Sequence, residues 1–178
     1  CHKVTLTGEC ADEIFGGYPW FHKKECLEAD IFPWSMDFRP RTMLLRDDVL
    51  RELPLQEYAW EAYRRTVEET PVLEGEGAEE KRRREISYLN LRWFMQTLLD
   101  RMDRTSMHVG LEARVPFADH RIIEYAWNVP WNMKYRGGVV KALLRAAGKE
   151  YLPEEILYRK KSPYPKTYDP AYERLVRS

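Results

Sequence analysis

Four residues near the N-terminus have the side chains and the spacing of an anion and metal site. Thr7 and Gly8 end a short apolar segment, and Glu9 and Asp12 follow closely. A Thr-Gly pair after a strand lets backbone approach a ligand, and the next helix start offers unpaired N–H groups to an anion. Carboxylates beside such an anion need a cation, and Asp12 suits Mg²⁺, which takes one or two carboxylates plus substrate phosphates. The alternative is that Glu9, Asp12 and Glu13 only cap a helix.

The surrounding segments predict a mainly α-helical chain that begins with one strand. Val4–Leu6 has the pattern of a short buried strand, and Ala11–Tyr18 that of a helix loosened or ended by two glycines. The longest predicted helix, Ala78–Met102, contains no Gly or Pro, and its apolar residues recur every three or four positions. We expect shorter helices over 43–53, 56–69 and 139–147, the last closed by Gly148, and one that is capped by Asp119 and passes through Ile122 to Trp127.

The composition argues against several classes of partner. Lys plus Arg and Asp plus Glu number 29 each, so the basic surface of a nucleic-acid-binding protein is not expected. No apolar run approaches the roughly 18 residues of a membrane span, and the first residues do not form a signal peptide. We therefore expect a cytoplasmic protein that binds neither nucleic acid nor membrane. The three cysteines and four histidines lack disulfide or zinc spacing, which predicts reduced thiols and no structural transition metal.

Three segments resemble the asparagine synthetase family. The run LTGECADEIFGGY, from Leu6 to Tyr18, is similar to the family signature S/T-G-E-G-x-D-E-x-F-G-G-Y. The segments DRMDRTSM (100–107) and GLEARVPFADHR (110–121) follow in the family's order. The resemblance covers most of the chain and implies a single domain over 1–178. Its implied fold is the helical C-terminal portion of an adenine-nucleotide α-hydrolase-like (ATP pyrophosphatase) α/β domain, with one residual short strand at the N-terminus.

The resemblance implies a reaction and assigns residues to it. The family activates the side-chain carboxylate of aspartate with ATP, forms aspartyl-adenylate and pyrophosphate, and then transfers ammonia derived from glutamine. The ATP and pyrophosphate site carries over to Thr7 and Gly8, and the acid needed for adenylate formation and ammonia attack to Glu9. The carboxylate for Mg²⁺ carries over to Asp12, so the implied cofactors are ATP and Mg²⁺. Glu9 has the chemistry to accept a proton from ammonia.

Two further segments resemble the family's phosphate-facing lysine stretches. Lys141 lies in GVVKALLR, and Lys161 ends the run YRKK. The resemblance implies that both lysines bind the ATP phosphates and that Lys161 is also catalytic. A fixed ammonium would stabilise the charge that develops on the leaving pyrophosphate. We expect the neighbouring Lys160 to be a surface residue.

The sequence also departs from the family pattern. Cys10 stands where the family more often has Gly, and we interpret it as a small buried side chain rather than a nucleophilic thiol. The family's SGGxDS phosphate loop and its N-terminal glutaminase domain are not in this sequence. We therefore expect a fragment whose natural partner is the N-terminal half of the same enzyme. Alone it should be inactive and should self-associate through its exposed strand, forming a homo-oligomer.

Two alternative functions remain open. β-Lactam synthetases share the ligase domain but close a ring without external ammonia, and they typically carry Tyr at the position of Glu9. The second alternative is a non-catalytic helical interaction module in which the acids serve as caps. That interpretation leaves Glu9, Asp12, Lys141 and Lys161 unexplained. The residues do not distinguish glutamine from free ammonia as the nitrogen donor.

Overall fold

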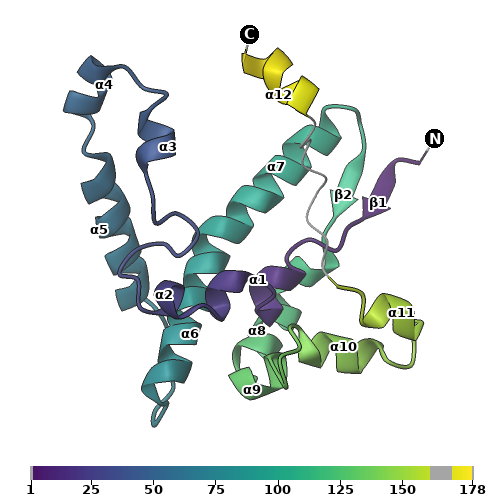
Figure 1. The fold of residues 1–178 in the computed structure, drawn as a ribbon. Helices are drawn as coiled ribbons and strands as arrows, with labels where there is room; N and C mark the ends of the chain where they lie inside the picture. The colour runs from purple at the N-terminus through teal and green to yellow at the C-terminus, as the bar shows by residue number, and fades with distance from the viewer. Residues whose placement is uncertain (1, 161–169, 178) are drawn as a thin grey trace. The chain divides into compact units, whose positions relative to one another are not determined.

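The computed structural model describes residues 2–160 and 170–177. It divides into two compact units, residues 1–144 and 145–178. Helices predominate, as the sequence predicts, and a second strand joins the expected one (Figure 1). In the described part of the chain, every helix is too short or too polar to span a membrane.

The two short strands lie side by side as a parallel pair. β1 (Val4–Leu6) pairs with β2 (Glu112–Arg114), with Val4 opposite Glu112 and Leu6 opposite Arg114. The Thr7 N–H donates to the Arg114 carbonyl at 3.0 Å, which continues the pairing past the end of β1. β1 is not the buried strand that its apolar residues predict, because Leu6 is 72% exposed. In α/β proteins, parallel strands are normally covered on both faces.

The first helices are short and carry the signature run. α1 (Ala11–Phe15) ends at Gly16, whose φ of 67° is left-handed, so it is shorter than the predicted 11–18. A 3₁₀ turn, η1 (Pro19–Phe21), and α2 (Lys24–Leu27) follow. A left-handed glycine is a common helix end, because a side chain at that φ would be strained.

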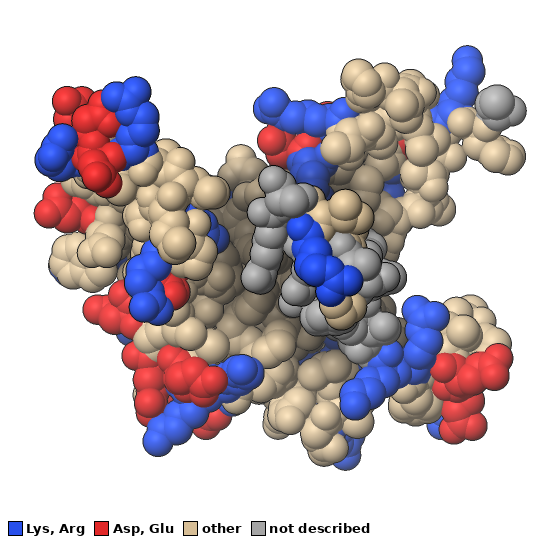
Figure 2. All heavy atoms as spheres, turned by 45° about the horizontal axis from the view of Figure 1, so that its top comes forward, with Lys and Arg blue, Asp and Glu red and all other residues tan. Residues whose placement is uncertain are grey.

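The next three helices lead away from the strands. α3 (Arg39–Thr42) and α4 (Asp47–Glu52) replace the single helix expected over 43–53, and α5 (Leu55–Glu68) matches the helix expected over 56–69. On the face shown in Figure 2, basic and acidic side chains are interspersed over α4. That mixture agrees with the equal numbers of the two charges in the sequence.

The predicted long helix is a continuous helical run that extends five residues further than expected. α6 (Ala78–Leu89) passes through a π-helical turn, η2 (Asn90–Phe94), into α7 (Met95–Met107) (Figure 1). Asn90 is fully buried at the start of the π turn, where its Nδ2 donates to the Ile86 carbonyl at 2.7 Å. The wider π turn accommodates one extra residue without ending the helix.

The chain after β2 returns to the core of the first unit. A 3₁₀ turn, η3 (Pro116–Ala118), leads to α8 (His120–Trp127) and α9 (Trp131–Lys134). The predicted cap is confirmed, since Asp119 Oδ1 accepts the Arg121 N–H at 2.9 Å. α10 (Ala142–Gly148) begins three residues after the expected Val139, and α11 (Glu154–Leu157) and α12 (Pro170–Arg177) complete the described elements.

Three apolar clusters hold the first unit together. One joins α1 to α7 and α8, a second joins α5 to α6, and a third joins η1 to α6 and α9. Their buried members are Cys10, Ala11, Ile14, Phe15, Met95 and Ala126; Phe32, Ala62, Tyr63 and Leu89; and Phe21, Ile86 and Trp131. The first cluster fixes the signature run against α7, and this contact positions the candidate site.

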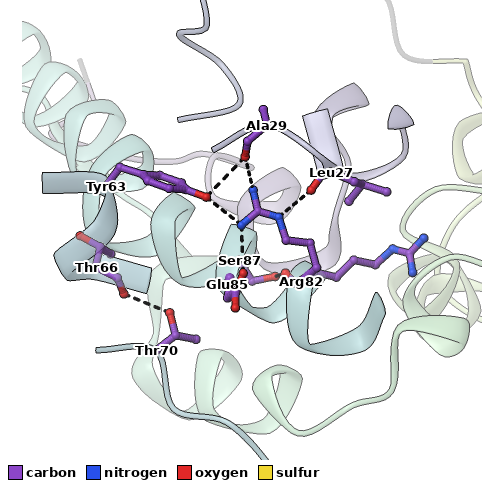
Figure 3. Close-up of polar contacts among 9 residues, drawn as sticks. Leu27, Ala29, Tyr63, Thr66, Thr70, Arg82, Glu85 and Ser87 are labelled. Carbon is purple, nitrogen blue, oxygen red and sulfur yellow. Dashed lines mark hydrogen bonds and ion pairs between the residues drawn. The ribbon is translucent and has the colours of Figure 1, made fainter. Parts of the chain in front are cut away.

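A polar network ties the loop after α2 to α5 and α6 (Figure 3). Arg82 donates from Nε to the Leu27 carbonyl at 2.7 Å and from Nη2 to the Ala29 carbonyl at 2.6 Å. Its Nη1 donates to the Tyr63 hydroxyl and to Glu85 Oε2, both at 2.9 Å. All three guanidinium nitrogens are used, so the loop carbonyls and the carboxylate are satisfied away from bulk water.

Candidate functional site

The turn that follows β1 has the open backbone expected of a ligand site. Thr7 accepts the Glu9 N–H on its Oγ1 at 3.3 Å, a local bond that shapes the turn around Gly8. A Cβ added to Gly8 would meet no atom within 4 Å. The backbone at Gly8 therefore faces open space, and a ligand can approach it without a side chain in the way.

Cys10 links the turn to α1 and is held in an unusual conformation. Its φ of 71° is left-handed, which costs a residue with a Cβ about 1 kcal/mol or more relative to Gly. This φ gives a physical reason for the Gly that the family signature has there. The side chain is 1% exposed, as predicted, and burial, with Glu13 and Glu9 nearby, raises the pKa of the thiol to about 12. A thiol with that pKa is protonated at neutral pH and is a poor nucleophile.

The two acids of α1 have different environments. Glu13 is buried, and it accepts a hydrogen bond from the Tyr18 hydroxyl at 2.6 Å. Burial and this bond raise the pKa of Tyr18 well above its usual range. Glu13 is therefore part of the packed interior rather than a solvated first-turn acid. Asp12 instead faces Lys141, and their Oδ1 and Nζ atoms lie 2.8 Å apart.

The Asp12–Lys141 ion pair brings together residues far apart in the sequence. Lys141 lies outside α10, in a turn where its own φ is 54°, so the helix expected over 139–147 does not contain it. Both side chains are about one-fifth exposed, at 20% for Asp12 and 21% for Lys141. The structure thus brings the predicted Mg²⁺ ligand, Asp12, into contact with a predicted phosphate-binding residue, Lys141.

Gly17 makes room for this ion pair. A Cβ at Gly17 would lie 1.8 Å from Asp12 Oδ1 and 2.5 Å from Lys141 Cε. No real side chain fits at those distances, so any residue larger than Gly would displace the pair. The signature glycine at this position therefore has a geometric reason that its sequence position alone does not reveal.

Glu9 is paired with an arginine to which the sequence pattern assigns no role. Arg101 on α7 donates from Nη2 to Glu9 Oε1 at 2.7 Å, across 92 positions of sequence. The Glu9 side chain is 16% exposed and that of Arg101 56%. The one sequence signal for Arg101 is its place in the family-like segment 100–107.

The described residues offer a partial site for Mg²⁺. Among residues 2–160 and 170–177, no group of three or more His, Cys, Asp or Glu could hold a metal by itself. Mg²⁺ that binds with substrate phosphates needs only one or two carboxylates, and Asp12 suits that role. Lys161, the other predicted phosphate ligand, lies outside the described residues.

The arrangement combines the Glu9 carboxylate, held by an arginine, and the Asp12 carboxylate, paired with a lysine. An open turn at Gly8 precedes both in the chain. Each member of the Asp12–Lys141 pair can bind a ligand of opposite charge in place of its partner. A phosphate attracts Lys141, and a metal ion attracts Asp12. Such a site is suited to a ligand that carries both phosphate and metal. It is poorly suited to thiol chemistry, because the only nearby described thiol, Cys10, has a raised pKa.

Comparisons with known proteins agree with the signature. The family model described as asparagine synthase matches residues 1–178. Over 173 residues the chain is 53% identical to asparagine synthetase [glutamine-hydrolyzing] 3 of Bacillus subtilis, covering 97% of this chain and 28% of that protein. It is 26% identical to asparagine synthetase [glutamine-hydrolyzing] 1 of the same organism over 194 residues, covering 91% of this chain and 30% of that protein. The mouse asparagine synthetase [glutamine-hydrolyzing] is 43% identical over 67 residues, covering 36% of this chain and 12% of that protein. The chain therefore spans less than a third of the length of these relatives.

Proposed function

The chain belongs to the asparagine synthase family, and from this membership we propose that it forms part of the synthetase site of an enzyme that converts aspartate to asparagine. The enzyme uses ATP to form aspartyl-AMP and pyrophosphate, and ammonia released from glutamine completes the reaction. The observation that carries the proposal is the ion pair between Asp12 and Lys141, which joins the signature run to the lysine segment that resembles a phosphate-binding stretch.

Different residues of the site bind different parts of the proposed substrate and its metal. Thr7 and Gly8 bind the nucleotide along the open backbone, and Lys141 and Lys161 bind the phosphates. Developing negative charge on pyrophosphate is stabilised best by cations that are already in place. Asp12, together with the pyrophosphate, would hold Mg²⁺, which when bound neutralises phosphate charge.

Glu9 serves the second half of the proposed reaction. Ammonia attacks the carboxyl carbon of aspartyl-AMP, the bond from that carbon to the AMP oxygen breaks, and the attacking nitrogen must lose one proton. Glu9 accepts that proton, a role that requires a carboxylate held near the nucleophile. Its pairing with Arg101 supports this role, because the hydrogen bond from Arg101 Nη2 to Oε1 holds the carboxylate in place.

The proposal is tested by Glu9→Gln in the full-length protein that contains this chain. We expect asparagine formation to fall at least a hundredfold while glutamine hydrolysis continues, since a general base contributes about 10²–10⁴-fold. Glu68→Gln is the matched control, because Glu68 makes only an exposed pair with Arg64 on α5. Asparagine and AMP are quantified together. Unchanged asparagine synthesis in Glu9→Gln would remove Glu9 from the mechanism, and a parent protein that makes no asparagine from aspartate and ATP would overturn the function.

A further inference from the structure

The Glu9–Arg101 pair leaves the two carboxylate oxygens in different situations. Oε1 accepts the Arg101 Nη2 hydrogen bond at 2.7 Å. Oε2 is buried and has no hydrogen-bond partner among the described residues. A carboxylate can accept about four hydrogen bonds, so Glu9 keeps unused acceptor capacity on its inner oxygen. The pairing therefore orients the group without saturating it.

Arg101 is well placed to impose that orientation. It projects from α7, whose Met95 and Leu99 pack on the cluster that contains Cys10 and Ala11, directly after Glu9 in the sequence. The helix and the turn are thus fixed relative to each other by apolar packing. A guanidinium on one of them can then hold a carboxylate on the other at a set distance.

We propose that Arg101 is a positioning residue for Glu9: it binds Oε1 and so keeps Oε2 directed inward as the acceptor for the nitrogen nucleophile. The inference rests on the proposed function and deepens it, because it explains how one oxygen of Glu9 stays without a partner among the described residues while the other is held. Arg101 itself does not contact the substrate. Its effect on the reaction passes through Glu9.

The test compares Arg101→Ala, Arg101→Lys and the control Arg104→Ala in the full-length protein. Arg104 is the matched control because it lies one turn further on α7 and pairs with Asp100 at 2.7 Å, with both side chains mostly exposed. We expect Arg101→Ala to lower kcat for asparagine synthesis ten- to hundredfold with the KM for ATP changed less than twofold. Arg101→Lys should recover part of the loss, and Arg104→Ala should stay within twofold of the parent.

A double-mutant comparison separates positioning from a structural role. In a Glu9→Gln background, Arg101→Ala should change the remaining activity less than twofold, because the group it positions is gone. An equal loss in both backgrounds, or a loss that comes with a lower melting temperature and is not recovered by Lys, would overturn the proposal. So would an Arg101→Ala enzyme with parental kcat. In each of these cases the parent still makes asparagine, so failure of the positioning role is distinct from failure of the proposed function.

Discussion

The Arg82 network and the Glu9–Arg101 pair both join an arginine to a glutamate, yet they differ in how many of their charged atoms have hydrogen-bond partners and in how exposed the side chains are. Arg82 engages four acceptors, and its side chain and that of Glu85 are 19% and 12% exposed. Arg101 is mostly exposed, and Glu9 retains an oxygen without a partner among the described residues. A closed network serves the fold, whereas an unsaturated pair beside open backbone is available to a ligand.

The largest effect is expected from opening the closed network. Arg82→Ala should lower the free energy of unfolding by about 3 kcal/mol or more, because it leaves the Glu85 carboxylate and the Leu27 carbonyl without the donor that Arg82 supplies. The measurement is denaturant unfolding of the purified protein. Arg64→Ala is the control, since its 3.5 Å pair with Glu68 is exposed and should contribute less than about 1 kcal/mol. Equal effects of the two variants would show that the network is not structural.

Lys134 is a buried lysine whose charged form is disfavoured in the folded protein. It is 6% exposed, and burial, followed by the nearby Arg84 charge, lowers its pKa from 10.5 to about 8, while Glu80 partly offsets the shift. Between these two pKa values the unfolded chain binds more protons than the folded chain. The free energy of unfolding must therefore rise with pH in this window.

The expected rise from this lysine is about 2 kcal/mol between roughly pH 8 and 9.5, at about 1.4 kcal/mol per pH unit. Denaturant unfolding at several pH values would measure it. Lys134→Met should remove the slope, whereas Lys81→Met, on the exposed side of α6, should keep it. A slope that persists in Lys134→Met would assign the titration to another group.

The sequence predicts the features that local rules determine. The long helix follows from its apolar period, and the Asp119 cap follows from the preference of Asp for that position. It does not predict β2, because three residues are too few for an alternating pattern to indicate a strand, and β2 is defined by its pairing with β1. The π turn at 90–94 likewise depends on packing around a buried Asn90.

The candidate site shows the same division between local and long-range information. The signature marks Glu9 and Asp12, but their partners, Arg101 and Lys141, come from segments more than 90 positions away. Only the folded chain shows which of the many basic side chains reaches which acid. The left-handed φ of Cys10 is also hidden, because a non-glycine residue gives no signal of that conformation.

The smallest effect on stability is expected at Gly17, whose neighbour Gly16 serves the fold whereas Gly17 itself serves the site. Gly17 does not need a left-handed φ, and the three atoms nearest to its added Cβ all belong to the side chains of Asp12 and Lys141. Gly17→Ala should therefore leave the free energy of unfolding within about 1 kcal/mol of the parent and lower asparagine synthesis about tenfold, through displacement of the ion pair.

Gly16→Ala is the contrasting variant. It places a Cβ 2.2 Å from the buried Trp131 ring at a φ of 67°, so it should destabilise the fold by more than about 1 kcal/mol. Melting curves and activity are measured on both variants. If Gly17→Ala unfolded the protein as readily as Gly16→Ala, the Asp12–Lys141 pair would belong to the structural framework, and the contrast with the closed Arg82 network would fail.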